Sequence, residues 1–471
     1  MANSSSLSSL SPVNTAVNYF LSSIKSSSVI YVAFSGGLDS TVLLHALNEA
    51  IQNENENYNF KLKAIYVDHG LQADSKAWSL HCQQVCDGLA VEFVSLEIEL
   101  GSFSRKGLEA IARTERYKAI TEVIEKASAS ESYLITGHHQ RDQAETLLLN
   151  LFRGAGVNGL AAMPFCKESY SSSGFVVKHC RPLLKVPYSE LGKYSESHQL
   201  KYINDQTNQD TQFRRNFVRH DVLKVIESSW PDVQASISNT ANHMQEASQL
   251  LDIFAQKSLS VTFSSCCFIA LHKMEEVSWI EQKNTIRFWF KQNWPGIVLS
   301  SGHYEWIKRS LLNYEDSQNQ NFSYQLSSGY LRVYKDRLYY LKNKPIAFSL
   351  VLKEADSLSE VRPGLLNEFL DGFNNFIFKN IDLNKSSNAI LRSILTTDEI
   401  NKKHLKSFFQ SHDIPVWERA FWPVLELESG EVVVLGCEKC TDVHNDFVDK
   451  NASEKHIGLS YARRMELMQL V

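Results

Sequence analysis

The sequence predicts an α/β protein whose N-terminal part is a doubly wound, Rossmann-like parallel sheet. Short apolar segments alternate there with longer helical stretches, polar motifs directly follow several of these segments, and the pattern ends near residue 180. Strands that alternate with helices are typical of βαβ units, which build parallel sheets. After this sheet we expect a mostly helical domain and then a small α+β domain.

Four apolar segments are the expected strands of the sheet, and they cover residues 29–34, 63–70, 91–98 and 133–139. The stretches after them, at 41–51, 75–90 and 107–127, have helical patterns. Ligands of doubly wound sheets bind at the carboxyl ends of the strands. The motifs SGGLDS (35–40), VDHG (67–70) and GHHQRD (137–142) fall at such ends, so we expect them to lie close together.

The later regions carry different patterns. We expect a long helix from about Phe213 to Glu227, another over 277–294, a strand over 331–342, and a hairpin over 422–436 that turns at Ser429–Gly430. The expected domains are a Ser-rich segment with a first helix over 1–28, the sheet domain over 29–220, the mostly helical domain over 221–345 and the α+β domain over 346–471.

Composition excludes several classes of protein. The chain has 471 residues, 43% of them hydrophobic, and a net charge of −5, which does not suit a wholly cationic nucleic-acid binder. No segment reaches the ~18–20 apolar residues that a membrane span requires. Eight cysteines in so long a chain predict reduced thiols, and the N-terminus lacks the basic and apolar regions of a signal peptide. We therefore expect a cytoplasmic protein that contacts no membrane.

The segment between the first strand and the first helix of the sheet predicts a nucleotide site. Two glycines let the backbone approach a ligand, and the helix start offers N–H groups and a favourable dipole to an anion. No lysine stands where a Walker A loop requires one. The alternative is a simple turn in which an aspartate complements the helix dipole. The candidate ATP-binding residues are Ser35, Gly36, Gly37, Leu38, Asp39 and Ser40.

The GHHQRDQAET segment (137–146) places two carboxylates on one helix face. Asp142 and Glu145 are three residues apart, and beside a polyphosphate they would repel it unless they held a cation. The candidates are Mg²⁺ and the ammonium group of a substrate. The adjacent His138 and His139 lack further ligands at zinc spacing, and the metal ligands stay unassigned.

Two arginine-containing segments are candidate phosphate contacts, because guanidinium groups bind phosphates in a bidentate manner. Arg113 and Arg116 lie in the expected helix over 107–127. The second segment begins the expected helix after Phe213, whose ring could stack. Its basic residues are Arg214, Arg215, Arg219, His220 and Lys224, with Asn216 among them. Taken alone, each segment is also compatible with a solvated basic surface.

The motifs together resemble a known family. SGGLDS is similar to the PP-loop of the ATP pyrophosphatase superfamily, and within it the chain resembles the tRNA(Ile)-lysidine synthetases. The matching segments are VDHGL (67–71), GLEAIARTERY (107–117), GHHQRDQAETLLLNLFRGAG (137–156), RPLL (181–184) and DQTNQDTQFRRN (205–216), with a looser match at IPVWERAFWPVLE (414–426). Gln72 and Thr207 depart from the family's usual residues, and position 72 receives no role.

The resemblance implies an ATP-dependent carbon–nitrogen ligase that modifies tRNA. ATP with Mg²⁺ would adenylate the C2 carbonyl oxygen of the wobble cytidine of tRNA(Ile) with a CAU anticodon, and free L-lysine would then attack C2 and displace AMP to form lysidine. In this scheme Asp39 organises ATP and Mg²⁺, Arg113 stabilises charge, and Asp142 with Glu145 binds the lysine amine. Arg214, Arg215, Asn216 and Arg219 would contact tRNA.

Two other classes stay open. A PP-loop enzyme with another nucleophile could be a tRNA thiolase or an ammonia-dependent synthetase, and a non-catalytic RNA-binding protein could use the same fold. Thiolases need cysteines, but the one C-x-x-C motif, Cys437 to Cys440, is far in sequence from the ATP motifs, and Cys82 and Cys86 are expected as core thiols. The sequence leaves the oligomeric state open, with a homodimer as one candidate.

Overall fold

The computed structural model describes most of the chain, in two compact units that are presented separately, Met1–Leu250 and Leu251–Val471. The described residues are 11–53, 59–68, 75–98, 108–127, 131–170, 175–205, 209–261, 268–270, 277–294, 296–312, 322–326, 328–334, 337–341, 349–353, 388–411, 416–420, 423–426 and 429–434. The Ser-rich residues 1–10, the end of the VDHG motif, Gln72, Thr207 and the C-x-x-C motif lie outside them.

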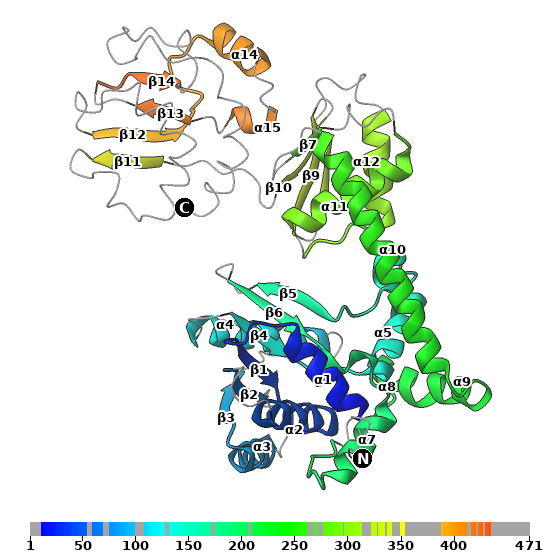
Figure 1. Ribbon diagram of the computed structural model, residues 1–471. Helices are drawn as coiled ribbons and strands as arrows, with labels where there is room; N and C mark the ends of the chain where they lie inside the picture. The colour runs from blue at the N-terminus through cyan, green and yellow to red at the C-terminus, as the bar shows by residue number, and fades with distance from the viewer. Residues whose placement is uncertain are drawn as a thin grey trace, which may run out of the picture. The chain divides into compact units, whose positions relative to one another are not determined.

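The first unit contains a six-stranded sheet (Figure 1) in the order β3-β2-β1-β4-β6-β5. All neighbours are parallel except β5, which runs antiparallel to β6 at the edge. The doubly wound parallel sheet predicted from the sequence is therefore confirmed, with an additional hairpin at one edge. The strands are β1 (Val29–Ala33), β2 (Lys61–Asp68), β3 (Glu92–Glu97), β4 (Ser132–Ile135), β5 (Cys166–Tyr170) and β6 (Val176–Cys180).

Helices cover both faces of this sheet, because its central strands bury both of their faces. In β1, Ile30 and Val32 belong to one apolar cluster, whereas Val29 and Tyr31 belong to another. Successive side chains of a strand point to opposite faces, so a strand covered on both sides is apolar throughout. The helices of this region are α1 (Pro12–Ser22), α2 (Leu38–Asn53), α3 (Ser75–Leu89), α4 (Leu108–Ala127), α5 (Gln140–Phe152), α6 (Val157–Leu160) and α7 (Tyr188–Ser197).

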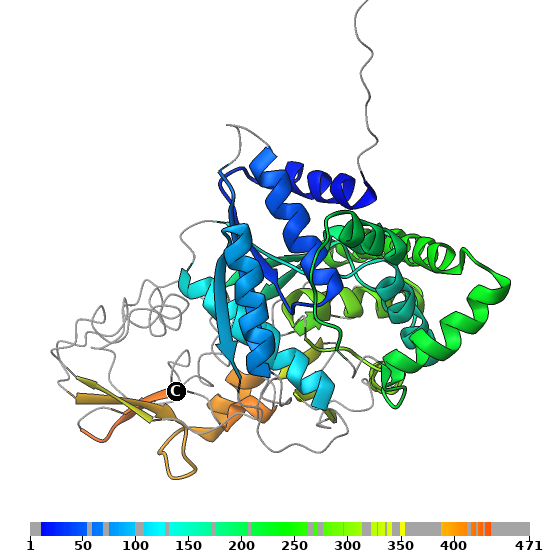
Figure 2. The ribbon, with the colours of Figure 1, turned by 90° about the horizontal axis from the view of Figure 1, so that it is seen from below.

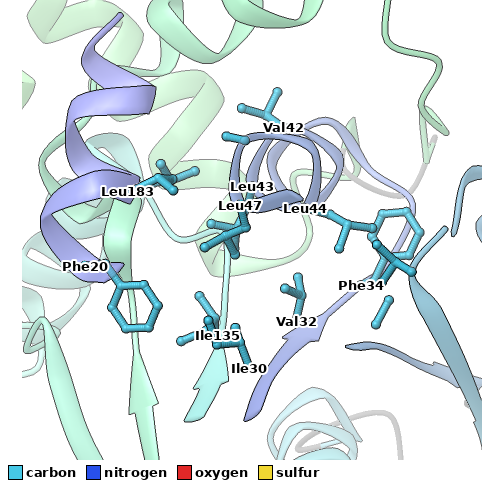
Figure 3. Close-up of a cluster of buried hydrophobic side chains, with 14 of the residues drawn as sticks. Phe20, Ile30, Val32, Phe34, Val42, Leu43, Leu44, Leu47, Ile135 and Leu183 are labelled. Atoms are coloured by element: carbon cyan, nitrogen blue, oxygen red, sulfur yellow. The ribbon is translucent and has the colours of Figure 1, made fainter. Parts of the chain in front are cut away.

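The larger cluster joins α1 and α2 to the sheet. Figure 3 shows Phe20 of α1 and Leu47 of α2 beside Ile30 of β1 and Ile135 of β4. Figure 2, which views this unit from below, shows α2 and α3 in front of the strands. On the other face, Ile120 and Ile124 of α4 pack with Tyr31. Burial on this scale fixes α2 against the sheet, and α2 begins where the nucleotide loop ends.

The expected helix after Phe213 is present, but it is not uniform. It consists of α8 (Arg214–Phe217), a π-helical segment over Val218–Leu223 and α9 (Lys224–Ser229), and it leads to the long α10 (Val233–Val261). A π-helical turn inside an α-helix is rare and is found frequently at functional sites.

The second unit contains two four-stranded sheets, in the orders β7-β10-β9-β8 and β11-β12-β13-β14. The helices α11 (Trp279–Asn293) and α12 (Ser301–Leu312) pack on the first sheet, through a core that includes Trp289, Phe290 and Ile307. The strands are β7 (Phe268–Ala270), β8 (Phe322–Leu326), β9 (Gly329–Tyr334), β10 (Arg337–Leu341), β11 (Ser349–Lys353), β12 (Asn388–Ser393), β13 (Pro423–Glu426) and β14 (Val432–Val434), and the remaining helices are α14 (Lys402–Ser411) and α15 (Val416–Arg419).

Two expectations for this unit have different outcomes. The single strand expected over 331–342 is wrong, because its residues belong to the antiparallel pair β9 and β10. The two strands end and begin at Tyr334 and Arg337, and they pair residue by residue over Tyr330–Tyr334 and Arg337–Leu341. The C-terminal hairpin is confirmed, since β13 pairs with β14 and Gly430 between them has φ of +81°.

Candidate functional site

The nucleotide loop joins β1 to α2 in a tightly enclosed turn. Gly36 has φ of +74°, a left-handed conformation that glycine adopts readily. A Cβ atom at this position would lie 2.8 Å from Cys82 Sγ and 2.9 Å from Ile203 Cδ1. The backbone amide of Ile203 donates a hydrogen bond to Gly36 O at 2.8 Å. The loop therefore needs glycine for its backbone conformation and for the close approach of its neighbours.

Hydroxyl groups hold the loop in shape. Ser40 Oγ donates to Gly37 O at 3.1 Å, accepts from the Ser35 amide at 3.3 Å, and lies 3.2 Å from Ser35 Oγ. The candidate ATP-binding residues thus form one hydrogen-bonded turn at the start of a 16-residue helix. The helix start and its dipole favour an anion such as phosphate at this place.

The second motif of the site packs directly on the first. β1 and β4 are parallel neighbours, so their carboxyl ends lie at the same edge of the sheet. A Cβ atom on Gly137 would lie 2.8 Å from Asp39 O. The expectation that SGGLDS and GHHQRD lie close together is confirmed, and Gly137 is required for their contact.

The Asp39 carboxylate has the features of a cation ligand. Its Oδ1 atom is buried and accepts no hydrogen bond from the residues that the structure describes, while Oδ2 lies 3.7 Å from His139 Nε2. His139 Nδ1 accepts a hydrogen bond from the Arg141 amide, so the ring proton of a neutral His139 is on Nε2. A buried carboxylate oxygen without a donor is rare, and beside a nucleotide loop it suits Mg²⁺.

Two other histidines, His138 and His179, lie on either side of the Thr136 hydroxyl and are kept neutral. Thr136 Oγ1 bridges His138 Nδ1 at 2.7 Å and His179 Nε2 at 3.0 Å. Burial lowers the pKa of His138 to about 3. Burial and the charge of Arg181 lower the pKa of His179 to about 2. Near neutral pH both rings are therefore uncharged hydrogen-bonding groups.

Three cations gather next to these histidines, and we call Arg113, Lys167 and Arg181 the basic cluster. Arg113 Cζ lies 5.4 Å from the centre of the Tyr117 ring, which in turn is 5.1 Å from the His179 ring. Burial, and then the charge of Arg113, lower the pKa of Arg181 to about 10 despite the opposing effect of Tyr117. The pKa of Lys167 is lowered by loss of solvation of its ammonium group, and further by the charges of Arg181 and Arg113. A positive charge that lowers the pKa of neighbouring cations would be stabilised by an anion bound at this place.

The acidic pair of Asp142 and Glu145, which also lies next to His139, is already bonded to two arginines. Arg215 donates to Glu145 Oε2 at 2.7 Å and to Asp142 Oδ1 at 2.8 Å. Arg219 donates to Glu145 Oε1 at 2.6 Å and to Oε2 at 3.1 Å. Asp142 Oδ2 accepts from the amide of His139, which caps α5. Each of the four carboxylate oxygens therefore has at least one donor.

Electrostatics keep this cluster ionised despite its burial. Burial alone would raise the pKa of Asp142, but His139 and Arg215 outweigh it and hold the pKa below its usual value. Burial would likewise lower the pKa of Arg215, and the two carboxylates raise it instead. Glu145 is fully buried. Removing one partner from such a buried pair costs about 3–5 kcal/mol, because the other charge is left uncompensated.

The four candidate tRNA contacts are in different environments. Arg215 and Arg219 are engaged with the acidic pair, whereas the Arg214 residue is exposed. Asn216 donates to Asp210 O at 2.9 Å. The i,i+4 spacing of Arg215 and Arg219 matches that of two residues on one helix face, and this was the signal that could have paired them with Asp142 and Glu145.

Sequence reasoning missed several site residues. Thr136, Tyr117 and His179 connect Arg113 to His138, and the Tyr188 ring lies 3.7 Å from Arg141 Cζ. Arg181 opens the RPLL segment, which was noted without a role. The signal for Arg181 was its place directly after an apolar segment, since β6 ends at Cys180 beside β4.

The cysteines require one correction. Cys166 and Cys180 form a disulfide between β5 and β6, so the expectation of reduced thiols throughout is wrong. The two residues are paired across the antiparallel hairpin, an edge that the sequence pattern did not reveal. Cys82 and Cys86 are buried core thiols as expected, and burial raises the pKa of each to about 12.

The fold and the site define the class of protein, a PP-loop enzyme that uses ATP. The model of the family described as a PP-loop domain matches residues 10–226, and that of the TilS substrate C-terminal domain matches residues 395–455. Among solved structures, the chain is similar to the U34-tRNA thiolase NcsA from Methanococcus maripaludis. That likeness has 21% identity and a TM-score of 0.41, over 50% of this chain and 78% of the other.

Relatives named tRNA(Ile)-lysidine synthase match most of the chain. The relative from Hydrogenovibrio crunogenus is 34% identical over 417 residues, which cover 86% of this chain and 93% of its own length. The relative from Coxiella burnetii is 32% identical over 427 residues, which cover 88% and 90%. The chain belongs to the tRNA(Ile)-lysidine synthase family, and the resemblance seen in the motifs is confirmed. Within the described residues, no helix is long and apolar enough to cross a membrane.

Proposed function

We propose that this protein ligates free L-lysine to C2 of the wobble cytidine of tRNA(Ile) with a CAU anticodon. The products are lysidine, AMP and pyrophosphate. The observation that carries the proposal is the acidic pair directly beside the nucleotide loop, joined to Asp39 through the ring of His139. In a member of this family, that arrangement puts a site for an amine next to a site for phosphate.

The first step is the adenylation of the cytidine. ATP binds with its β- and γ-phosphates against residues 35–40, at the start of α2, and the C2 oxygen attacks the α-phosphate with loss of pyrophosphate. Mg²⁺, for which the free Asp39 Oδ1 is the fitting ligand, neutralises phosphate charge when bound. Adenylation makes the C2 oxygen part of a good leaving group.

The basic cluster supports this step. Negative charge that develops on the α-phosphate is stabilised by cations already held in place, which is an efficient form of catalysis. We assign this role to Arg113, assisted by Arg181. The neutral His138, which lies 2.7 Å from Thr136 Oγ1, can form a hydrogen bond there without adding charge.

The second step is attack by lysine. The ε-amine attacks C2, AMP leaves with the former C2 oxygen, and the amine gives up its proton to solvent. Asp142 and Glu145 accept hydrogen bonds from the amine group and orient it. Since Arg215 and Arg219 already occupy these oxygens, lysine has to share the carboxylates with them or displace one guanidinium group. A guanidinium released in this way would be free for tRNA phosphate.

The proposal is tested by incorporation of labelled lysine into a tRNA(Ile) transcript with a CAU anticodon, in the presence of ATP and Mg²⁺. A tRNA(Met) transcript is the control. Label on the isoleucine transcript alone, with AMP and pyrophosphate, supports the proposal. Pyrophosphate without label would contradict lysine as the nucleophile and point to another PP-loop enzyme, such as a thiolase.

Several parts of this account stay predictions. They are the Mg²⁺ requirement, the exposed Arg214 as a tRNA contact, the domain boundaries at residues 28, 220 and 345, the cytoplasmic location and a homodimer. Sedimentation of the full chain would test the dimer directly.

A further inference from the structure

A second cluster of ligating side chains lies away from the nucleotide loop, between α2 and the end of α7. His45 and Glu49 are on α2, and His198 caps α7. One potential ligand atom from each of the three residues lies within 4.8 Å of the others. None of the three takes part in the function proposed above.

The hydroxyl group of Tyr194 contacts two members of this cluster. Its hydroxyl donates to Glu49 Oε2 at 3.0 Å and lies 3.0 Å from His45 Nδ1. Because the hydroxyl proton goes to Glu49, the tyrosine oxygen accepts from the His45 ring. Tyr194 itself is buried, with its ring stacked 4.1 Å from that of His198. The position of the hydroxyl is therefore fixed.

The proton of His198 is fixed as well. Its Nδ1 atom lies 2.9 Å from the carbonyl oxygen of Tyr194, which can only accept, so Nδ1 carries the hydrogen. The other ring nitrogen, Nε2, is left with a lone pair and lies 3.8 Å from Glu49 Oε2. Ligating histidines commonly donate their second N–H to a backbone carbonyl in this way.

We propose that His45, Glu49 and His198 bind a divalent transition-metal ion of the zinc class. Two imidazoles and one carboxylate suit Zn²⁺, whereas Mg²⁺ and Ca²⁺ prefer oxygen ligands alone. With bonds of about 2.0–2.2 Å, ligand atoms around a tetrahedral zinc ion lie roughly 3.3–3.5 Å apart. The side chains of Glu49 and His198 are 38% and 30% exposed, so small rotations can close the site, with solvent as the fourth ligand.

The metal would connect two elements that enclose the nucleotide loop. α2 begins at that loop, and the chain after His198 reaches Ile203, whose amide bonds to Gly36 O. A bound ion would fix the start of this segment on α2. Without the ion, the segment from His198 to Ile203 would be held less firmly against the nucleotide loop. We therefore expect the KM for ATP to rise while kcat changes little.

The test measures zinc bound by the full-length chain without ATP, after dialysis against a weak chelator. The matched control is His243, an exposed helical histidine that lies 3.9 Å from Glu246 but belongs to no group of three ligating side chains in the part of the chain that the structure describes. All variants also carry Cys437→Ser and Cys440→Ser, so that the C-x-x-C motif does not contribute. The buried Cys82 and Cys86 stay protonated, since burial raises the pKa of each to about 12.

We expect one zinc ion per chain in the parent and in His243→Gln, and close to none in His198→Gln. Tyr194→Phe, which removes only the orienting hydroxyl, should weaken binding by about 10–100-fold. Co²⁺ substitution should give the intense visible absorption of a low-coordinate site in the parent and lose it in His198→Gln.

The proposal is overturned if the parent binds no zinc, or if His198→Gln binds as much as His243→Gln does. Both readouts are independent of lysine incorporation. Absence of zinc binding would therefore not contradict the proposed ligase function, and absence of lysine incorporation would not contradict the metal site.

Discussion

The acidic pair and the basic cluster are two charged regions of the same domain, and their charges are balanced in different ways. Asp142 and Glu145 are buried and fully bonded to Arg215 and Arg219. In the basic cluster, burial and then the neighbouring positive charges lower the pKa values of Arg181 and Lys167. The acidic pair has its positive partners within the protein itself, whereas the basic cluster favours the binding of an anion.

This difference indicates how a single site can serve two substrates of opposite charge. The basic cluster is prepared for phosphate before ATP arrives, and its unfavourable repulsion is relieved on binding. The acidic pair is neutralised until an ammonium group competes for it. The following changes would break or sharpen this comparison, beginning with the largest expected effect.

Glu145→Gln should have the largest effect, because it leaves two guanidinium groups without a full counter-charge. We expect a loss of about 3–5 kcal/mol in the free energy of unfolding, measured by urea denaturation. Lysine incorporation should fall by at least about 10²-fold, since the nucleophile loses its orientation. The control is Glu190→Gln, whose carboxylate pairs only with an exposed lysine. Equal stability of the two variants would contradict a buried, paired Glu145.

Arg113→Gln should have the opposite profile. Arg113 is exposed and belongs to a cluster of like charges, so the free energy of unfolding should stay within about 0.5 kcal/mol of the parent. Pyrophosphate release should fall by about 10²–10³-fold, the usual cost of losing one charge-stabilising donor. Lys126→Gln on the same helix serves as the control. An unchanged rate of pyrophosphate release would remove Arg113 from the catalytic scheme.

Acid should destabilise the protein through the two neutral histidines. Their folded pKa values, about 3 for His138 and about 2 for His179, are below the ordinary value of 6.5, so the unfolded chain binds more protons below pH 6.5. Their contribution is complete above pH 6.5 and is lost as the pH falls from there towards 3, by about 1.4 kcal/mol per pH unit for each histidine. Urea denaturation at several pH values gives the free energy of unfolding as a function of pH, and this free energy should change less steeply with pH in His138→Asn than in the parent. If the free energy of unfolding changed with pH equally in the variant and in the parent, the lowered pKa of His138 would be refuted.

Arg214→Gln should have the smallest effect. Because the residue is exposed, the free energy of unfolding should not change measurably. The affinity for tRNA should decrease a few-fold, and the slope of log affinity against log salt concentration should decrease by the amount expected for about one phosphate contact. Arg219→Gln should instead lose stability, since its guanidinium is bonded to Glu145. If Arg214→Gln left both tRNA affinity and salt dependence unchanged, its predicted role would be wrong.

The sequence predicts features that follow from local pattern and from the rules of parallel sheets. The apolar β1 and the glycines after it indicate the nucleotide loop, and parallel topology then brings Gly137 to Asp39. The i,i+4 spacing of Arg215 and Arg219 places both on one helix face, but it does not identify carboxylates about 70 residues earlier as their partners, because a run of charges is equally compatible with a solvated surface. The pairing of β5 with β6, its disulfide and the cluster around Tyr194 depend on tertiary packing in the same way.

The most direct test of the account measures pyrophosphate release and lysine incorporation in the same reaction for Asp142→Asn. Asparagine keeps the shape of the side chain and one acceptor oxygen, for either Arg215 or the His139 amide, but it removes the charge offered to the amine. If the acidic pair serves lysine and the basic cluster serves phosphate, pyrophosphate release should persist while lysine incorporation is lost. Full lysine incorporation, or an equal loss of both products, would contradict this division of the site.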